Sequence, residues 1–146
     1  MTYLLDINVL VALFDAAHIH HEAAHRWFGG IGKDSWATCP LTENGLIRVL
    51  SNPAYPTVSA SPVELGNRLR TFCSQPGHVF WPDSETLTDA ARFDLARLRG
   101  HQQVTDLYLV GMASRYGGKL ATFDTAIPFE ALVGKSADVV EVLPTT

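Results

Sequence analysis

The sequence predicts an α/β domain whose mostly parallel sheet is covered by helices on both faces. Short apolar runs alternate along the chain with longer stretches of helical period, a pattern typical of parallel strands joined by crossover helices. The 146 residues, 47% of them hydrophobic, provide for one domain over residues 1–146 with a sizeable core. The charged fraction of 18% lies below the usual share of about 25%, which favours a well-buried interior.

Five short apolar runs are predicted as strands because turn-forming residues bound them. They cover residues 3–5, 35–39, 78–81, 120–123 and 139–143. The segments between them predict helices by length and period. These helices cover residues 7–14, 21–28, 41–50, 61–74, 85–98 (as one helix or two) and 104–116.

Local signals support several of the predicted helix ends. Pro40 fits a first helical turn, where its missing N–H is not needed. The string Ser61-Pro62-Val63-Glu64 has the form of a capping box with proline at the first helical position. Gly117 follows the strongest helix and is typical of a helix end.

Four carboxylates follow apolar runs and carry the functional prediction. They are Asp6, Glu43, Asp106 and Asp124. Residues that end a buried strand or open the next helix lie at the carboxyl edge of the sheet, where α/β folds build their sites. Carboxylates that converge repel one another unless a cation neutralises them. All-oxygen ligation indicates Mg²⁺ or Mn²⁺, so we expect a metal-dependent phosphodiester or phosphoryl enzyme.

Each acid also has an ordinary structural interpretation. Asp6 is a good N-cap, Glu43 and Asp106 suit the first turn of a helix, and Asp124 suits a turn. The occurrence of all four at carboxyl edges favours a shared site over four separate coincidences. Asn8 is expected to hold Asp6 in position through its amide.

Charge and cysteine usage restrict the class of protein. A net charge of −4 argues against broad electrostatic attraction to nucleic acid, although the site acids themselves contribute to that number. Cys39 and Cys73 stand in apolar surroundings, which indicates reduced thiols and a cytoplasmic protein. No apolar stretch reaches about 18 residues, so we expect no membrane insertion.

Two rival motifs lead to other enzymes. The string His21-Glu22-Ala23-Ala24-His25 matches H-E-x-x-H of zinc peptidases, but no later residue stands at a typical spacing for the third ligand. The string Asp6-Ile7-Asn8 resembles half of the haloacid-dehalogenase phosphatase signature, in which Asn8 would have to be an acid.

Basic residues near the third acid are a further expectation. Arg92, Arg97 and Arg99 precede Asp106 and could guide a phosphate backbone toward the metal. A solvated face is an equally good account of each of them.

Taken together, the chain resembles the PIN-domain proteins and, more narrowly, the VapC toxins of toxin–antitoxin modules. The resemblance covers essentially the whole chain and rests on four ordered segments. These are LLDINVL at 4–10, ENGLIRVLS at 43–51, HQQVTDLYL at 101–109 and LATFD at 120–124.

The resemblance implies a three-layer α/β/α sandwich with a central parallel sheet, usually dimeric. It also implies an endoribonuclease dependent on Mg²⁺, with Mn²⁺ as a substitute, that cleaves structured RNA (tRNA or ribosomal RNA) and arrests translation. Asp6, Glu43, Asp106 and Asp124 would be the catalytic metal ligands, supported by Asn8 and Thr105. The expected partners are a VapB-type antitoxin and, through that complex, operator DNA. A PIN fold that binds RNA or a partner without cleaving is the alternative.

Overall fold

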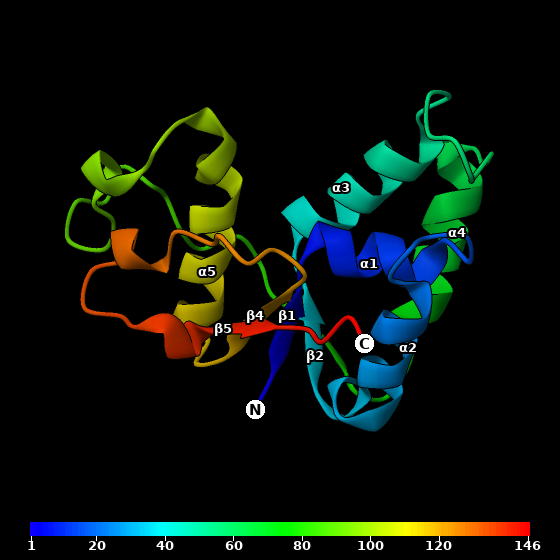
Figure 1. The fold of residues 1–146 in the computed structure, drawn as a ribbon, viewed down its shortest axis with the longest axis horizontal. Coiled ribbons are helices and arrows are strands. Elements are labelled where there is room, and N and C mark those ends of the chain that lie inside the picture. Colours follow the sequence, from blue (N-terminus) through cyan, green and yellow to red (C-terminus); the bar gives the residue numbers. More distant parts are fainter.

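Five parallel strands form the centre of the protein in a computed structural model that describes residues 1–146 (Figure 1). The strand order is β3-β2-β1-β4-β5, and every neighbouring pair is parallel. Their bounds are β1 Tyr3–Leu5, β2 Trp36–Thr38, β3 His78–Phe80, β4 Lys119–Thr122 and β5 Val140–Val142. The predicted sheet is confirmed, with each strand at its expected place and within about two residues of its expected ends.

Helices cover both faces of this sheet, as predicted for an α/β/α sandwich. The five α-helices are α1 Ile7–Phe14, α2 His21–Gly30, α3 Pro40–Ser51, α4 Pro62–Phe72 and α5 Val104–Arg115. Figure 1 shows α1 to α4 gathered on one side of the strands and α5 on the other. No helix of the structure is both long and apolar enough to cross a membrane.

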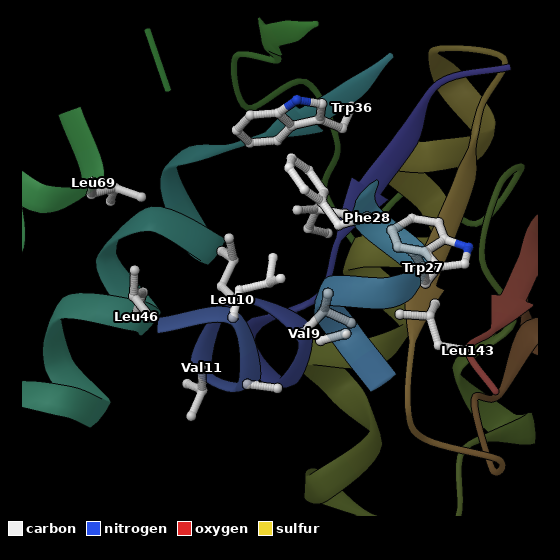
Figure 2. Close-up of a cluster of buried hydrophobic side chains, with 14 of the residues drawn as sticks. Val9, Leu10, Val11, Trp27, Phe28, Trp36, Leu46, Leu69 and Leu143 are labelled. Carbon is white, nitrogen blue, oxygen red and sulfur yellow. The ribbon is translucent and has the colours of Figure 1, made fainter. Parts of the chain in front are cut away.

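Two hydrophobic cores, one on each face of the sheet, follow from the alternation of side chains along a strand. Leu5 belongs to the core under α1 to α4, while its neighbour Leu4 belongs to the core under α5. Figure 2 shows the first core, where Trp36 of β2 lies among aliphatic and aromatic side chains of the covering helices. The apolar stripe of α5, from Leu107 to Met112, packs into the second core.

The predicted helix-end signals are present, although only one of the two backbone bonds of the predicted capping box is formed. Pro40 occupies the first turn of α3, and the Ser61 hydroxyl accepts a hydrogen bond from the backbone N–H of Glu64 at the start of α4. Gly117 follows α5 with a φ of 71°, a backbone conformation that glycine adopts without strain. These three signals explain why the helix ends could be predicted.

The predicted helix over 85–98 is wrong. The segment consists of turns and one short 3₁₀ helix, Leu95–Arg97. Its backbone bonds to a distant segment instead: the Asp94 N–H donates to the Ala131 carbonyl, and the Val133 N–H donates to the Arg92 carbonyl. Tertiary pairing has replaced the hydrogen bonds that a helix would have made within the segment.

Candidate active site at the carboxyl edge of the sheet

Asp6 is the central carboxylate because β1 is the middle strand of the sheet. It directly follows Leu5 and is the N-cap of α1, where its Oδ1 accepts a 2.7 Å hydrogen bond from the Ile7 N–H. Its Oδ2 accepts a second hydrogen bond of 2.8 Å from the Thr122 hydroxyl. With 6% of its surface exposed, Asp6 is both the expected cap and a buried, oriented carboxylate.

Thr122, the last residue of β4, joins three parts of this edge. Besides donating to Asp6, its hydroxyl oxygen accepts from the Asn8 amide at 3.1 Å and from the Asp124 N–H at 3.0 Å. Asn8 in turn accepts from the Phe123 N–H through Oδ1 at 3.2 Å. The end of β4 is thereby fastened to the first turn of α1, and Asp124 is held beside Asp6.

Asp106 completes a group of three aspartates. It stands in the first turn of α5, which packs against β4 and β1. Burial and then the negative charges of Asp6 and Asp124 raise the pKa of Asp106 to about 6. Burial also raises the pKa of Asp6 above its usual value, opposed by the hydrogen bonds from Thr122 and Ile7, and the charge of Asp124 raises it further. The three carboxylates are close enough to repel one another.

Such a set fits a hard divalent cation. Three carboxylates supply only oxygen donors, the preferred ligands of Mg²⁺ and Mn²⁺. Their mutual repulsion is an unfavourable energy that a bound cation would remove. The donor chemistry and the charges of this edge therefore agree with the predicted metal site.

Glu43 does not join the three aspartates in this structure. Its Oε2 accepts a 2.6 Å hydrogen bond from the Thr38 hydroxyl, and its carboxylate lies with the side chains of Cys73 and His78. Burial and then the charge of Glu43 raise the pKa of Cys73 to about 11. Burial lowers the pKa of His78 below its usual value, and the charge of Glu43 opposes that change. Of the four predicted acids, the structure brings together three.

A groove of about 770 Å³ lies next to the aspartates. Its walls come from α1, α3, α5 and the segment after β3. The lining residues are Ile7, Pro40, Leu41, Asn44, Gly45, Arg48, Asp83, Glu85, Thr105 and Tyr108. Leu41, Asn44, Gly45 and Arg48 follow a helical i, i+3, i+4, i+7 pattern and form one face of α3. At about 100° per residue, Glu43 projects from a different face, which is why its position in the first turn did not place it in the groove.

The predicted supporting residues have separate outcomes. Asn8 contacts the end of β4, as described above, and does not bond to Asp6 directly. Thr105 lies in the first turn of α5 and lines the groove. The sequence analysis did not identify Thr122 or Arg48 as site residues. Thr122 was assigned only to a predicted strand, and Arg48 lies on the face of α3 that lines the groove.

Most of the arginines expected near Asp106 are already paired. Arg92 forms an ion pair with Glu85, and Arg97 forms one with Asp94 at 3.3 Å. Arg48 takes part in none of the three ion pairs of the structure. It is therefore the groove's available cation for a phosphate group.

The H-E-x-x-H motif is accounted for by contacts with α1. The His21 and His25 rings lie 4.4 Å apart, centre to centre. His21 Nδ1 bonds to the Ala12 carbonyl at 2.7 Å, and His25 Nε2 bonds to the Leu13 carbonyl at 2.9 Å. No His, Cys, Asp or Glu donor joins the pair as a third ligand, which a zinc peptidase requires.

A parallel sheet with three aspartates at its carboxyl edge is what the resemblance to PIN-domain proteins predicted, and comparison of the sequence with known families gives the same class. The profile described as PIN domain matches residues 3–133, so the chain belongs to the PIN-domain family.

Its relatives narrow this class to VapC-type PIN proteins. The chain is 44% identical over 143 residues to Ribonuclease VapC39 of Mycobacterium tuberculosis, covering 98% of this chain and 100% of that protein. It is 37% identical over 137 residues to Ribonuclease VapC44 of the same organism, covering 92% and 94%. For Ribonuclease VapC29, also from M. tuberculosis, the identity is 38% over 147 residues, covering 100% and 99%.

A solved structure supports the fold independently. The crystal structure of M. tuberculosis VapC20, described as a sarcin-ricin loop cleaving toxin, superposes with a TM-score of 0.62. The match covers 91% of this chain and 98% of that one at 12% sequence identity. At this identity the likeness establishes the shared architecture.

Proposed function

We propose that this protein is a metal-dependent endoribonuclease and the toxin of a VapBC-type pair. The observation that carries the proposal is the convergence of Asp6, Asp106 and Asp124, of which Asp6 and Asp106 have pKa values raised by burial and by neighbouring negative charge. Groups held in this way usually belong to functional sites. The VapC names of the relatives support the choice of RNA as substrate.

In this proposal Asp6, Asp106 and Asp124 hold Mg²⁺, for which Mn²⁺ substitutes. A bound divalent ion would lower the pKa of water and neutralise charge on the scissile phosphate. Thr122 and the Ile7 N–H keep the Asp6 carboxylate in one orientation. Asp106 orients the attacking water, and Arg48 binds the RNA backbone in the groove.

Glu43 remains the predicted fourth acid of the site. Its carboxylate would have to leave Thr38 and turn toward the groove to take part. The variant Glu43→Gln decides this: a loss of cleavage equal to that of Asp106→Asn makes Glu43 a fourth member, and wild-type cleavage leaves a site of three aspartates.

The proposed substrate is structured RNA, either tRNA or ribosomal RNA, whose cleavage would arrest translation. The proposed partner is a VapB-type antitoxin that occupies the groove beside the aspartates. We also propose a homodimer that reaches operator DNA through the antitoxin complex. The groove's size and its mixture of apolar and charged walls suit an inserted peptide segment.

The decisive experiment is cleavage of end-labelled RNAs by purified protein with Mg²⁺ or Mn²⁺. The substrates are a tRNA pool and a ribosomal RNA fragment that contains the sarcin-ricin loop, each assayed beside an EDTA arm. Asp106→Asn is the test variant, and Asp34→Asn, which changes an exposed aspartate, is its matched control. We expect discrete products that are absent with EDTA and with Asp106→Asn but present with Asp34→Asn. Metal-independent RNA binding without products would favour the non-catalytic alternative.

A further inference from the structure

A pair of side chains in the groove beside the aspartates has no part in the proposed metal site. Asp83, in the segment after β3, accepts a hydrogen bond through Oδ1 from the Tyr108 hydroxyl of α5. Both residues line the groove, and Asp83 is exposed to solvent. Burial, then the hydrogen bond with Asp83 and its charge, raise the pKa of Tyr108. The phenol therefore keeps its proton and holds the carboxylate in one orientation.

The Asp83 carboxylate can accept further hydrogen bonds. Its two oxygens offer about four lone-pair positions, of which Tyr108 occupies one. Glu85, the other acid of the groove wall, forms an ion pair with Arg92. Asp83 takes part in none of the three ion pairs of the structure. Within the groove wall, Asp83 is therefore the acid that remains available to the donors of a ligand.

This pair lies near the start of α3, and the available cation of the groove lies farther along the same helix. Burial and, as the smallest contribution, the charge of Asp83 raise the pKa of the Cys39 thiol, which places Asp83 near the N-cap of α3. Arg48 is the last groove residue of α3. At about 1.5 Å per residue, it lies roughly 13 Å along the helix axis from Cys39. The acceptor and the cation therefore stand toward opposite ends of the groove wall that α3 forms.

A nucleotide carries the groups that complement this arrangement. Its phosphate suits the guanidinium of Arg48, the face of its base suits the ring of Tyr108, and the edge of its base can bond to Asp83. The groove volume of about 770 Å³ lies within the usual range of small-molecule sites. One cation, one aromatic ring and one acceptor in the same groove therefore match a single nucleotide of an RNA strand.

Among the four RNA bases, guanine complements a carboxylate best. Its Watson–Crick edge presents two adjacent donors, the N1–H and the 2-amino group. Uracil presents one N–H between two carbonyl oxygens. Adenine and cytosine each present one amino group beside an unprotonated ring nitrogen, whose lone pair a carboxylate repels. Because Asp83 accepts and does not donate, its chemistry selects guanine.

We propose that Asp83, Tyr108 and Arg48 form a guanosine-binding subsite for the RNA substrate. The inference rests on the proposed nuclease function and adds a base preference to it. Asp83 accepts hydrogen bonds from the guanine edge, the Tyr108 ring lies against the base, and Arg48 binds a neighbouring phosphate. Asp83 is thus a specificity residue, separate from the aspartates that hold the metal.

The first test measures RNA binding by the whole protein in EDTA, where the proposed cleavage does not occur. The probes are fluorescently labelled uridine tetranucleotides in which one position is guanosine, inosine or adenosine. Guanosine should bind at least about 10-fold more tightly than adenosine, the discrimination expected of a paired base contact. Inosine lacks only the 2-amino group and should bind about 5-fold more weakly than guanosine. This comparison tests the contact on the wild-type protein, without any substitution.

Variants assign the contacts. Asp83→Asn should reduce the preference for guanosine over adenosine to within about 2-fold, because the amide supplies a donor that adenine N1 can accept. Tyr108→Leu should weaken binding of all three probes by a similar factor of about 5 or more, since stacking does not depend on the base. Asp34→Asn, the exposed aspartate used above as a control, should keep the preference of the wild type.

Cleavage of a random RNA pool with Mg²⁺ gives a second measurement. Sequencing of the product ends should show guanosine enriched at one fixed position from the cut, and the enrichment should disappear in Asp83→Asn. If no RNA is cleaved, the nuclease proposal fails while the binding test still decides this one. The subsite is overturned if guanosine, inosine and adenosine probes bind equally, or if Asp83→Asn keeps the wild-type preference. Either result would leave the Asp83 carboxylate to a basic side chain of a protein partner.

Discussion

The two ends of α1 carry buried aspartates that differ in almost every other respect. Asp6 precedes the helix and is 6% exposed, and Asp15 follows it and is 2% exposed. Asp15 accepts 2.6 Å hydrogen bonds from the Tyr55 and Thr57 hydroxyls and one of 2.9 Å from the Ala17 N–H. Burial raises its pKa, but these bonds outweigh burial and leave the pKa below its usual value.

Asp6 accepts fewer hydrogen bonds than Asp15 and has a negatively charged neighbour. It accepts two hydrogen bonds and lies in the field of Asp124, and its pKa is raised. Asp15 has three donors, and His18 nearby lowers its pKa further. Burial alone therefore does not identify a functional carboxylate. A carboxylate whose charge the fold has satisfied stabilises the structure, and one whose charge is left partly uncompensated is available to a cation.

The largest expected effect is loss of RNA cleavage in Asp6→Asn. Removing the charge of a proposed metal ligand should lower the cleavage rate with Mg²⁺ by at least about 100-fold, beyond the effect of changing a residue that only supports a ligand. The amide can still accept from the Ile7 N–H, so circular dichroism should show an intact fold. Asp15→Asn is the matched change and should keep wild-type cleavage in the folded fraction. Equal losses in both variants would contradict the distinction between the two ends of α1.

The next prediction compares Thr122, whose hydroxyl donates to Asp6, with Thr57, whose hydroxyl donates to Asp15. Thr122→Val removes the donor to Asp6 and the acceptor of Asn8 and Asp124, which should lower cleavage about 10- to 100-fold. Thr57→Val removes one of three donors to Asp15 and should leave cleavage unchanged while lowering the Tm by about 3 °C, the equivalent of roughly 1 kcal/mol. Cleavage rates and thermal unfolding of both variants check this, and unchanged cleavage by Thr122→Val would remove Thr122 from the site.

The role of Thr122 shows where prediction from the sequence ends. Local patterns predict the cap at Asp6 and the order of the acids along the chain. They also predict the strands, whose ends lie within about two residues of the expected ones. The contact between Thr122 and Asp6 joins residues 116 apart in sequence, and no local pattern identifies which threonine of the chain makes it. The direction of Glu43 depends likewise on how α3 is rotated about its axis against α1 and α4. The segment 85–98 was misjudged because its partners lie near residue 131.

The next effect concerns stability at the other end of α1. Asp15→Asn weakens three hydrogen bonds to a charged acceptor and should lower the Tm by about 5–10 °C at neutral pH. The folded pKa of Asp15 is lowered, so its contribution is present above the unfolded value near 3.8 and disappears as the pH falls through the folded pKa. The Tm difference between wild type and variant should therefore shrink in acid. A difference that stays constant down to about pH 2 would show that packing, and not charge, is responsible.

The smallest effect has the opposite sign and concerns Asp106. Its folded pKa of about 6 lies above the unfolded value of 3.8, so the metal-free protein binds more protons folded than unfolded in this range and loses stability as the pH rises from about 4 through 6. The Asp106→Asn variant has no carboxyl group at this position and should not lose this stability as the pH rises. Thermal unfolding in EDTA should show equal Tm values near pH 4 and a variant more stable by a few degrees near pH 7. Saturating Mg²⁺ should raise the Tm of the wild type alone and close the gap, because the cation compensates the same repulsion that the substitution removes. A wild type that gains stability over the variant between pH 4 and 7 in EDTA would mean that the carboxylates of this edge do not repel one another, and the contrast with Asp15 would fail.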